Sequence, residues 1–507
     1  MATILDRAIE WWNPGRGLVR RQARARIESL AKARMLYEGA STGRRSYGWR
    51  VAATDANAEI AGAKVRLRAI SRDMVRNNPL AARAVQVIDQ NVIGAGIVPT
   101  VKSRSEPRAE RIRKLIKRHL ETTAFDVFGQ HDLYGVQGLV TRCLVESGEV
   151  LVRRLWSTNR NLALPFQVQV LEPDFLDSTV DGQLANGNTA RQGIEYDKGG
   201  KRAAYHLYRN HPGSIDAFTQ ETIRVPARDI IHVFRGDRPG QERGVTWFHP
   251  VMVRMKDLAD FIDAQLMRQK IAACFAAFVT SETGPDGTLF DPEKDQDTGL
   301  PIENVAPGMV EYLRPGQDVK FGGPPQIGDF DPYVRATQRE IATGVGITYE
   351  ALTGDHSQVN YSSGRMGWIE FQRSIDLWRW RTIIPKLCNG IAEWTLEAVG
   401  IMAPGGVGEE ASIEWTPPKR EMLKPSEEVP TARDAIRSGL KSWSESVREL
   451  GQDPQAVARE ISEDQKLFDS LGLKLDSDGR FPMTRAVDDD PKRAAGPSAP
   501  NEGNNDA

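Results

Sequence analysis

The sequence predicts an α+β chain that is mainly helical, and three observations carry this prediction. Long segments repeat their apolar residues every three or four positions, as amphipathic helices do, whereas the stretch after Glu149 alternates every second residue, as half-buried strands do. The length of 507 residues exceeds what one ordinary core holds, so more than one structural region is expected. The composition, 40% hydrophobic and 27% charged, suits a chain that buries such cores in water.

Two helices separated by a proline are expected near the start. Apolar residues recur at helical spacing between Ala63 and Val92, but Asn77, Asn78 and Pro79 interrupt the stripe. Proline fits the first turn of a helix, so Pro79 should open the second one. The elements expected next are a short strand at 97–103 and helices at 108–121 and 133–146.

From Glu149 onward the apolar period becomes two, which indicates strands. Four runs carry this alternation, and turn-rich stretches such as DGQLANGNTARQG separate them. The runs are VLVRRLW, FQVQVLEP, AAYHLYR and IIHVFR. Together with the preceding helices they predict an α+β block.

The second half is expected to hold three long helices, at 248–278, 331–345 and 362–399. Pro385 lies inside the third and should kink or break it. The segment between the first two is crowded with Gly, Pro and Asp, which predicts loops around short strands at MVEYL and DVKF. Two or three small helices are expected at 431–471, followed by a polar tail that is expected to be disordered.

The net charge of −1 hides an uneven distribution. Residues 1–120 carry 25 Lys and Arg against 10 Asp and Glu, whereas 121–420 and 421–507 are both acidic. Two different electrostatic surfaces would explain this asymmetry, and a solvated basic helix surface would explain it equally well.

Cysteine usage and hydropathy indicate a reducing, aqueous compartment. The three cysteines lie far apart and form no CxxC pair, which argues against a disulfide framework. No apolar run reaches the ~18 residues of a membrane-spanning helix, and the first residues lack the apolar core of a signal peptide. The chain is therefore expected to be made and used in cytoplasm, with no membrane partner.

The sequence carries no recognisable catalytic motif, so no catalytic residue, metal site or cofactor is predicted. It lacks the phosphate-cradling G-x-x-x-x-G-K-[ST] loop, the zinc motif HExxH and the G-x-S-x-G nucleophile turn. Glu293, Asp295 and Asp297 resemble part of a calcium loop. Thr298, however, stands where that loop needs glycine, and Asn304 stands where it needs glutamate, so a solvated loop is the better interpretation.

Three stretches carry distinctive motifs. The most specific joins GITYEAL to NYSSGR, and the others are ISRDMVRNNPLA with QNVIG, and IRSGLKS with VRELGQD. These stretches resemble the portal proteins of lambda-type tailed phages. Their order and spacing fit the family over roughly residues 34–473. The family-motif residues are Arg72, Asp73, Asn78, Pro79, Tyr361, Ser362, Ser363 and Arg365.

The resemblance implies a ring of subunits, usually twelve, at one vertex of the capsid, through which double-stranded DNA enters and leaves. It also implies a subunit with a wing, stem helices, a clip, a tunnel loop and a crown. The regions assigned to this chain are a basic arm at 1–51, a wing at 52–247, stem helices at 248–278 and 329–345, a clip at 279–328, a tunnel loop at 346–361, a long wing helix at 362–400, a C-terminal crown region at 401–475 and a tail at 476–507.

The residues of the first stem helix suit a channel wall. The face opposite its apolar stripe carries Lys256, Asp260 and Asp263, which are expected to line the channel. Acidic belts repel phosphate and would let the duplex slide, whereas a wall of arginines would hold it. The alternative is that these carboxylates pair with Lys256 or Arg268 on the same or a neighbouring helix.

The implied tunnel loop is polar and contains glycine, which suits a mobile segment that touches the DNA backbone without reading bases. An ordinary surface turn is the alternative. The loop residues assigned to this role are Thr353, Asp355, His356, Ser357, Gln358 and Asn360.

The resemblance also implies several protein partners. The clip would dock the terminase large subunit, a separate ATPase, and later the head–tail joining proteins, while the termini would face packaged DNA, scaffold or the major capsid protein. The chain itself is predicted not to be an enzyme and to reside in the virion after assembly in the bacterial cytoplasm. Two other functions stay open: a DNA-processing enzyme such as a nuclease or motor subunit, and another capsid adaptor or scaffold.

Overall fold

The computed structural model describes residues 22, 23, 26, 48, 53–215, 221–273, 277–280, 310–313, 330–402, 411–419, 422 and 424–474. Contacts between Cα atoms divide the chain into two units, Met1–Glu59 and Ile60–Ala507. Most of the basic arm at 1–51, most of the clip at 279–328 and all of the tail at 476–507 lie outside the described residues. The architecture below is that of the second unit.

Helices α3 (Ala56–Asn77) and α4 (Pro79–Val92) follow one another around a single capping residue. The side-chain oxygen of Asn78 accepts hydrogen bonds from the backbone N–H groups of Leu80 (2.9 Å) and Ala81 (3.3 Å). These bonds satisfy donors that have no partner inside the helix. The prediction that Pro79 opens a second helix is confirmed. The elements that follow are α5 (Glu106–His119), the 3-10 turn η3 (Thr123–Phe125) and α6 (Leu133–Ser147).

Two antiparallel sheets and two strand pairs, β1 with β12 and β10 with β11, make up the β part of the described second unit. In one sheet β2 lies between β3 and β9, and in the other β4 to β8 follow in chain order. All four predicted strand runs are confirmed. The strands are β1 (Val98–Ser103), β2 (Glu149–Trp156), β3 (Phe166–Leu171), β4 (Gly182–Gln183), β5 (Thr189–Arg191), β6 (Ile194–Tyr196), β7 (Arg202–Tyr208), β8 (Thr222–Pro226), β9 (Ile230–Phe234) and β12 (Ala411–Thr416), with 3-10 turns η4 (Pro173–Phe175) and η5 (Ala227–Asp229).

One apolar core holds these layers together. Ile88 of α4, Val140 of α6, Val150 of β2 and Val233 of β9 are fully buried in it, because each lies on the inward face of its element. Val150 and Val233 are direct cross-strand partners. A smaller core lies under the five-stranded sheet. The pair of β1 and β12 joins the start of this region to its end.

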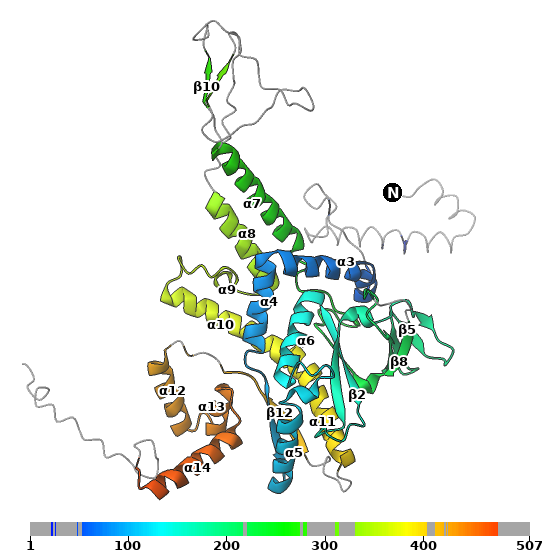
Figure 1. The fold of residues 1–507 in the computed structure, drawn as a ribbon, viewed down its shortest axis with the longest axis vertical. Coiled ribbons are helices and arrows are strands. Elements are labelled where there is room, and N and C mark those ends of the chain that lie inside the picture. The colour runs from blue at the N-terminus through cyan, green and yellow to red at the C-terminus, as the bar shows by residue number, and fades with distance from the viewer. Residues whose placement is uncertain are drawn as a thin grey trace, which may run out of the picture. The chain divides into compact units, whose positions relative to one another are not determined.

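The long third helix is continuous, but its middle is not α-helical. It consists of α10 (Tyr361–Trp378), a π-helical segment η6 (Arg379–Cys388) and α11 (Asn389–Met402) (Figure 1). Pro385 lies within the π segment. Of the kink or break predicted at Pro385, the break is wrong, because the chain stays helical through this residue. Proline lacks an N–H, and the wider turn takes up the disturbance while the chain stays helical.

Helices α7 (Met252–Ala273) and α8 (Phe330–Val345) correspond to the two predicted stem helices. The first is shorter than its predicted range of 248–278. Pro250 prevents a helical start at residue 248, and the aromatic and β-branched residues after position 277 form strand β10 (Ala277–Thr280) instead. Strand β11 (Val310–Leu313) pairs with β10 in parallel. We call α7 with α8 the hairpin, and α3 to β9 with α10, η6, α11 and β12 the body.

Three C-terminal helices follow the body, as predicted for residues 431–471. They are α12 (Pro425–Arg437), α13 (Trp443–Glu449) and α14 (Pro454–Leu471). The predicted α+β, mainly helical fold class is thus confirmed over the described residues. Within those residues, no helix combines the length and the apolar content that crossing a lipid bilayer requires.

Candidate functional site

The hairpin helices α7 and α8 lie side by side and run in opposite directions (Figure 1). Near the body, Arg254 Nε lies 3.3 Å from Glu340 Oε1. Farther along, the ring of Phe261 stacks on Phe330 with centroids 5.7 Å apart and meets Tyr333 at 4.7 Å. The start of α7 thus contacts the end of α8, and the middle of α7 contacts the start of α8. This order of contacts defines an antiparallel pair.

The three predicted channel-lining residues lie on the face of α7 that points away from α8. Met255 and Leu258 are buried on the inner face, and at 100° per residue Lys256, Asp260 and Asp263 fall on the opposite face. All three are exposed. The structure therefore brings them together on one solvent-facing stripe of the isolated chain.

These three charges are not equivalent. Lys256 Nζ donates hydrogen bonds to both oxygens of Asp260, at 2.7 and 3.0 Å, and these bonds raise the pKa of Lys256. Such an exposed pair contributes little to stability but largely cancels the charge of Asp260. The alternative that the carboxylates pair on their own helix thus applies to Asp260. Asp263 has no ion pair within the described residues, so it supplies the uncompensated negative charge.

The outer half of α7 leaves apolar side chains in solvent. Ile262 is 39% exposed and Leu266, one turn later on the same face, is 50% exposed, whereas the exposed Met267 lies on the face of Asp263. Single exposed apolar residues are ordinary, but two that share one face of a helix outside any core call for a covering partner. No described element of the chain covers them.

The predicted tunnel loop at 346–361 contains a short helix, α9 (Tyr349–Thr353). Thr348 caps it with a hydrogen bond from the N–H of Ala351, and Gly354 ends it in a left-handed conformation (φ +74°). Gly346 (φ +87°) makes the sharp turn that leaves α8. The first half of the segment assigned as the tunnel loop thus contains one helical turn.

Asp355 is the local anchor of the second half of the loop. The Ser357 N–H donates to its Oδ1 (3.0 Å) and the Tyr349 hydroxyl donates to its Oδ2 (2.9 Å). Hydrogen bonds from Ser357 and then Tyr349 lower the pKa of Asp355 to about 2. The carboxylate therefore stays ionised and ties the loop to α9.

The remaining predicted loop residues separate into outward-facing and supporting ones. His356, Ser357 and Gln358 are exposed and can meet a partner. Thr353 is half-buried, and its hydroxyl is bonded within α9, donating to the carbonyl of Tyr349 (2.9 Å). Asn360 caps α10 by accepting from the N–H of Ser363 (2.8 Å).

The family model that matches this chain is that of the phage portal protein, lambda family, and it covers residues 42–379. The chain belongs to the lambda family of phage portal proteins. The predicted family is thereby confirmed, and with it the prediction that the chain is a portal protein. The match spans α3 to α10, and therefore includes the hairpin and the loop that follows it.

Several relatives and solved structures are similar to this portal chain. A probable portal protein of Halomonas phage phiHAP-1 is 31% identical over 434 residues, which cover 80% of this chain and 81% of that one. The portal protein of Escherichia phage N15 is 23% identical over 479 residues, covering 84% and 88% of the two chains. A structure described as the neck of a native GTA particle with C12 symmetry has 16% identity and a TM-score of 0.40, over 76% of this chain and 94% of that one.

The first portal motif is structural in this chain. Arg72 Nη2 donates to Asp174 (2.6 Å) and Glu172 (2.9 Å), which ties α3 to the turn after β3. Asp73 accepts from the side-chain amide of Asn77 (2.8 Å) on the same helix. Asn78 and Pro79 form the helix start described above.

The second portal motif begins α10. Ser363 and Asn360 form a reciprocal capping box, so the Asn-Tyr-Ser-Ser spacing has a mechanical reason. The Lys424 ammonium lies 5.0 Å above the ring of Tyr361, which connects α10 to the start of α12. Ser362 and Arg365 are exposed.

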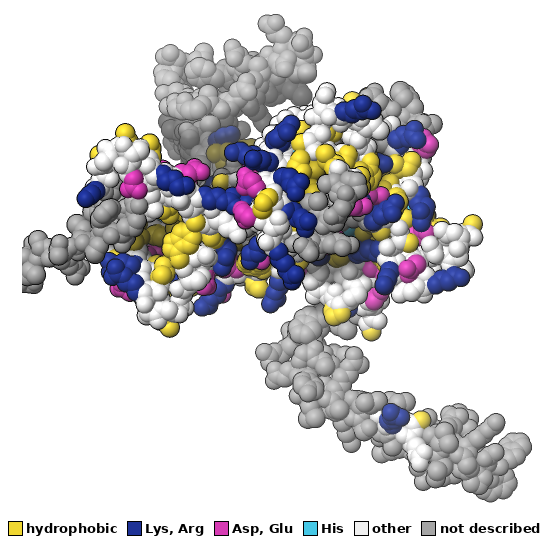
Figure 2. Space-filling model, turned by 90° about the horizontal axis from the view of Figure 1, so that it is seen from below, with side chains coloured by type: hydrophobic (Ala, Val, Ile, Leu, Met, Phe, Trp, Pro, Cys, Tyr) yellow, Lys and Arg dark blue, Asp and Glu magenta, His cyan; other side chains and the backbone are white. Residues whose placement is uncertain are grey.

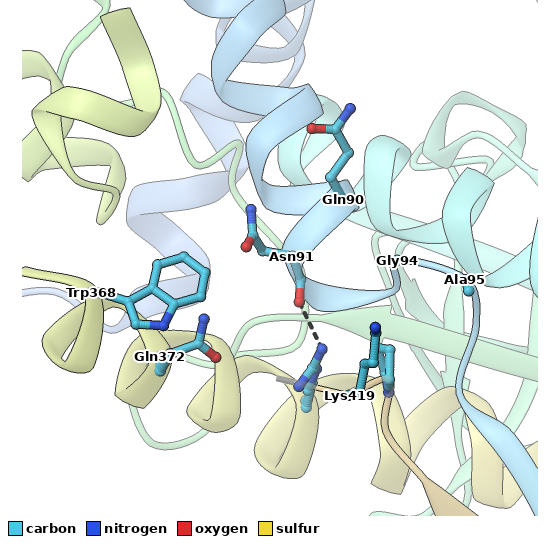
Figure 3. A pocket seen from close by; sticks show the side chains of 9 residues that line it. Gln90, Asn91, Gly94, Ala95, Trp368, Gln372 and Lys419 are labelled. Carbon is cyan, nitrogen blue, oxygen red and sulfur yellow. Dashed lines mark hydrogen bonds between the residues drawn. The ribbon is translucent and has the colours of Figure 1, made fainter. Parts of the chain in front are cut away.

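A pocket of about 210 Å³ lies between the end of α4, α10 and the residues after β12 (Figure 3). Its Arg379 donates to the backbone carbonyls of Asn91 (2.7 Å) and Val92 (2.8 Å), so this cation already satisfies the end of α4. The volume falls below the roughly 300–1,000 Å³ of typical small-molecule sites. We assign it to packing around the π segment. The residues that line it are Gln90, Asn91, Gly94, Ala95, Trp368, Gln372, Arg379, Pro418 and Lys419.

Three side chains of the kinds that bind metal ions lie close together, although the sequence predicts no metal site. Glu172, Asp174 and His211 place one ligand atom each within 4.8 Å of one another. The separation of 39 positions between Glu172 and His211 hides this proximity in the sequence. Arg68 (3.0 Å) and Arg72 (2.6 Å) already neutralise Asp174, so the cluster is explained as an ion-pair network.

A buried ionic network around Glu149 was also missed. Glu149, at 1% exposure, accepts from Arg243 Nη2 (2.6 Å), from the Gly244 N–H (2.9 Å) and from His232 Nε2 (3.1 Å). Burial alone would raise its pKa, but the charge of Arg243 and the bonds from His232 and Arg243 hold it well below its usual value. Gly148 allows the backbone before Glu149 to lie close to the backbone at Val245, because a Cβ at position 148 would lie 2.1 Å from the Val245 carbonyl carbon.

Proposed function

We propose that copies of this chain close into a ring around double-stranded DNA, with the hairpin in the wall of the channel. The exposed apolar flank of α7, which Ile262 and Leu266 form one turn apart, carries this proposal. An apolar flank on a projecting helix is stable in water when a neighbouring copy covers it. A ring of identical copies offers such a neighbour to every subunit, and twelve is the number we expect.

In this ring the outer face of α7 points into the channel. Lys256 and Asp260 neutralise each other there, whereas Asp263 repeats around the ring as a belt of negative charge. Phosphates are repelled weakly rather than held, which lets the duplex move during packaging and ejection. His356, Ser357 and Gln358 of the loop after α9 touch the backbone without reading the sequence.

The partners follow from the direction of the hairpin. Residues 279–328, which continue from the far end of α7, dock the terminase large subunit during packaging and head–tail joining proteins afterwards. The ATPase belongs to the terminase, since this sequence has no phosphate-binding loop. The chain itself acts as a structural conduit and not as an enzyme. Its place is a capsid vertex of the virion, reached after assembly in the host cytoplasm beside the scaffold and the major capsid protein.

The experiment that tests this function is imaging of the purified full chain by electron microscopy, together with native mass spectrometry. We expect closed rings with a central channel. The double substitution I262E/L266E should convert rings to monomers, because each copy would bury two carboxylates against its neighbour. The control F128E/I401E changes two exposed apolar residues of the body and should still assemble.

A strictly monomeric wild-type chain, at high concentration and at every salt tested, would contradict the proposal. Magnesium-dependent nuclease activity or ATP hydrolysis by the pure chain would instead favour a DNA-processing enzyme. A closed assembly without a central channel would favour another capsid adaptor.

A further inference from the structure

We propose that one face of α5 binds the phosphate backbone of duplex DNA outside the channel. This face, which we call the α5 ridge, consists of Arg111, Lys114, Lys117 and Arg118. The inference rests on the proposed function only in taking DNA as the partner of this chain. It concerns a second surface on a different element of the body.

The fold fixes the direction in which the ridge points. Ala109, Ile112 and Ile116 are at most 3% exposed and anchor the opposite side of α5 in the main core. At 100° per residue, Lys114 and Arg118 lie almost opposite that anchor. All four ridge residues are exposed. The cationic face therefore cannot rotate inward without taking the apolar anchor into water.

The acidic residues of α5 do not neutralise the ridge. The helix carries six Lys and Arg against two Glu. Glu106 accepts from Arg113 (2.9 Å) and from Arg459 of α14, and Glu110 accepts from Arg113 (3.1 Å) and from Arg459 (3.0 Å). The hydrogen bond from Arg113 lowers the pKa of Glu106. Docking of α14 thus occupies both carboxylates.

The ridge cations themselves remain available. Arg111, Lys117 and Arg118 have no ion pair among the described residues, and Lys114 reaches Glu110 only at 3.9 Å. Repulsion between these like-charged neighbours destabilises the helix face unless an anion lies against it. Figure 2 views the molecule from below, the end where Figure 1 places α5, and Lys and Arg side chains gather in the middle of that face.

The chemistry of the ridge favours phosphate over a protein partner. Protein interfaces centre on apolar or aromatic anchors, and α5 exposes no large apolar residue along its described length. Arg111 and Arg118 lie about 10 Å apart along the helix axis. Duplex DNA presents one charge per about 1.7 Å of its axis, so several phosphates lie within reach of the four cations. Binding that depends on exposed cations alone is independent of base sequence.

The test uses assembled rings of the full chain and relaxed, covalently closed circular DNA. A closed circle cannot thread a closed ring, so its binding reports only surfaces outside the channel. The ridge variant R111Q/K114Q/K117Q/R118Q should bind the circle about tenfold or more weakly at moderate salt. The slope of log K against log salt should fall by up to about 3.6, if each lost cation meets one phosphate.

The matched control removes four exposed cations from another part of the body, in R160Q/K198Q/K201Q/R228Q. This variant has the same net charge as the ridge variant and should bind the circle as the wild type does. Circular dichroism and ring imaging of both variants check that fold and assembly are unchanged.

The outcomes separate this proposal from the proposed function. If the wild-type chain forms no ring, the proposed function fails, and the ridge is still tested by the same binding assay on the monomer. If ridge and control variants weaken DNA binding equally, general charge explains the effect and the ridge proposal is overturned. If the ridge variant loses binding to polyglutamate while keeping DNA, the surface belongs to an acidic protein and the proposal is likewise overturned.

Discussion

The body and the hairpin satisfy their side chains in opposite ways. In the body, apolar residues such as Val150 and Val233 are fully buried. The buried Glu149 accepts hydrogen bonds from the Arg243 guanidinium, the Gly244 N–H and the His232 ring. In the outer half of the hairpin, Leu266 and Met267 stay in water and Asp263 has no ion pair within the described chain. The body thus buries and pairs its side chains through contacts within one chain. The outer half of the hairpin leaves side chains that no described part of the same chain covers or pairs.

This difference has an energetic consequence. A change in the body acts on the stability of each chain, because its partners are all internal. If the hairpin lies in the channel wall as proposed, a change on its outer face is expected to act on assembly or on the passage of DNA and to leave the stability of the single chain almost unaffected. Variants that break this division would therefore test the comparison directly.

The largest effect on stability is expected at Glu149. In E149Q the neighbouring Arg243, 2% exposed, loses its counter-charge while staying buried. Removing one partner of a buried ion pair costs about 3–5 kcal/mol, because the other charge is left without compensation. Denaturant unfolding of the monomer measures this loss.

A surface pair serves as the control for that prediction. Glu414 binds Lys102 Nζ at 2.6 Å, but its side chain is half-exposed, so E414Q should cost less than about 1 kcal/mol. Equal losses in the two variants would show that the network around Glu149 contributes no more than an exposed pair.

Two leucines of α7 sharpen the comparison within one helix. Leu258 is 1% exposed and belongs to the core of the body, whereas Leu266 is 50% exposed two turns later. L258A should lower the free energy of unfolding of the monomer by about 2–5 kcal/mol, through lost burial and a cavity. L266A should change it by less than about 0.5 kcal/mol but weaken ring assembly. Unfolding curves and native mass spectra of both variants measure the two effects. A large loss of monomer stability in L266A would place that residue in the body instead.

Local signals were the predictable part of this fold. The pair Asn78 and Pro79 predicts a helix start, because capping and the fixed φ of proline act within four residues. The alternation after Glu149 likewise predicted β2, β3, β7 and β9, since the period of a half-buried strand is visible in sequence. Family motifs added the order of the hairpin and the loop after it, which no local pattern supplies.

Contacts between distant residues were the unpredictable part. Arg243 reaches Glu149 across 94 positions and His211 reaches Glu172 across 39, so neither network has a sequence signature. The π segment around Pro385 depends on how the surrounding helix can widen, which the sequence rule for proline does not include. The pairing of Lys256 with Asp260 on the same helix is one of the alternatives that the sequence offers, because a spacing of four residues on a helix is a local signal.

The smallest expected effect is a pH dependence that arises at a buried histidine of the body. His232 is 7% exposed, and burial, with smaller contributions from the charges of Arg202 and Arg243, lowers its pKa to about 4 despite its bond to Glu149. Above pH ~6.5 this histidine is neutral in both the folded and the unfolded chain and contributes no slope. Between pH ~6.5 and about 4 the unfolded chain binds one proton more, so stability falls as the pH falls, by about 2 kcal/mol at pH 5. In H232Q the amide can still donate to Glu149 but does not titrate, so that part of the slope should vanish. The difference between the two unfolding profiles isolates His232, because carboxylates common to both chains cancel. Coincident profiles from pH 8 to pH 5 would mean that His232 is protonated alike in both states, and that the network around Glu149 admits a further positive charge.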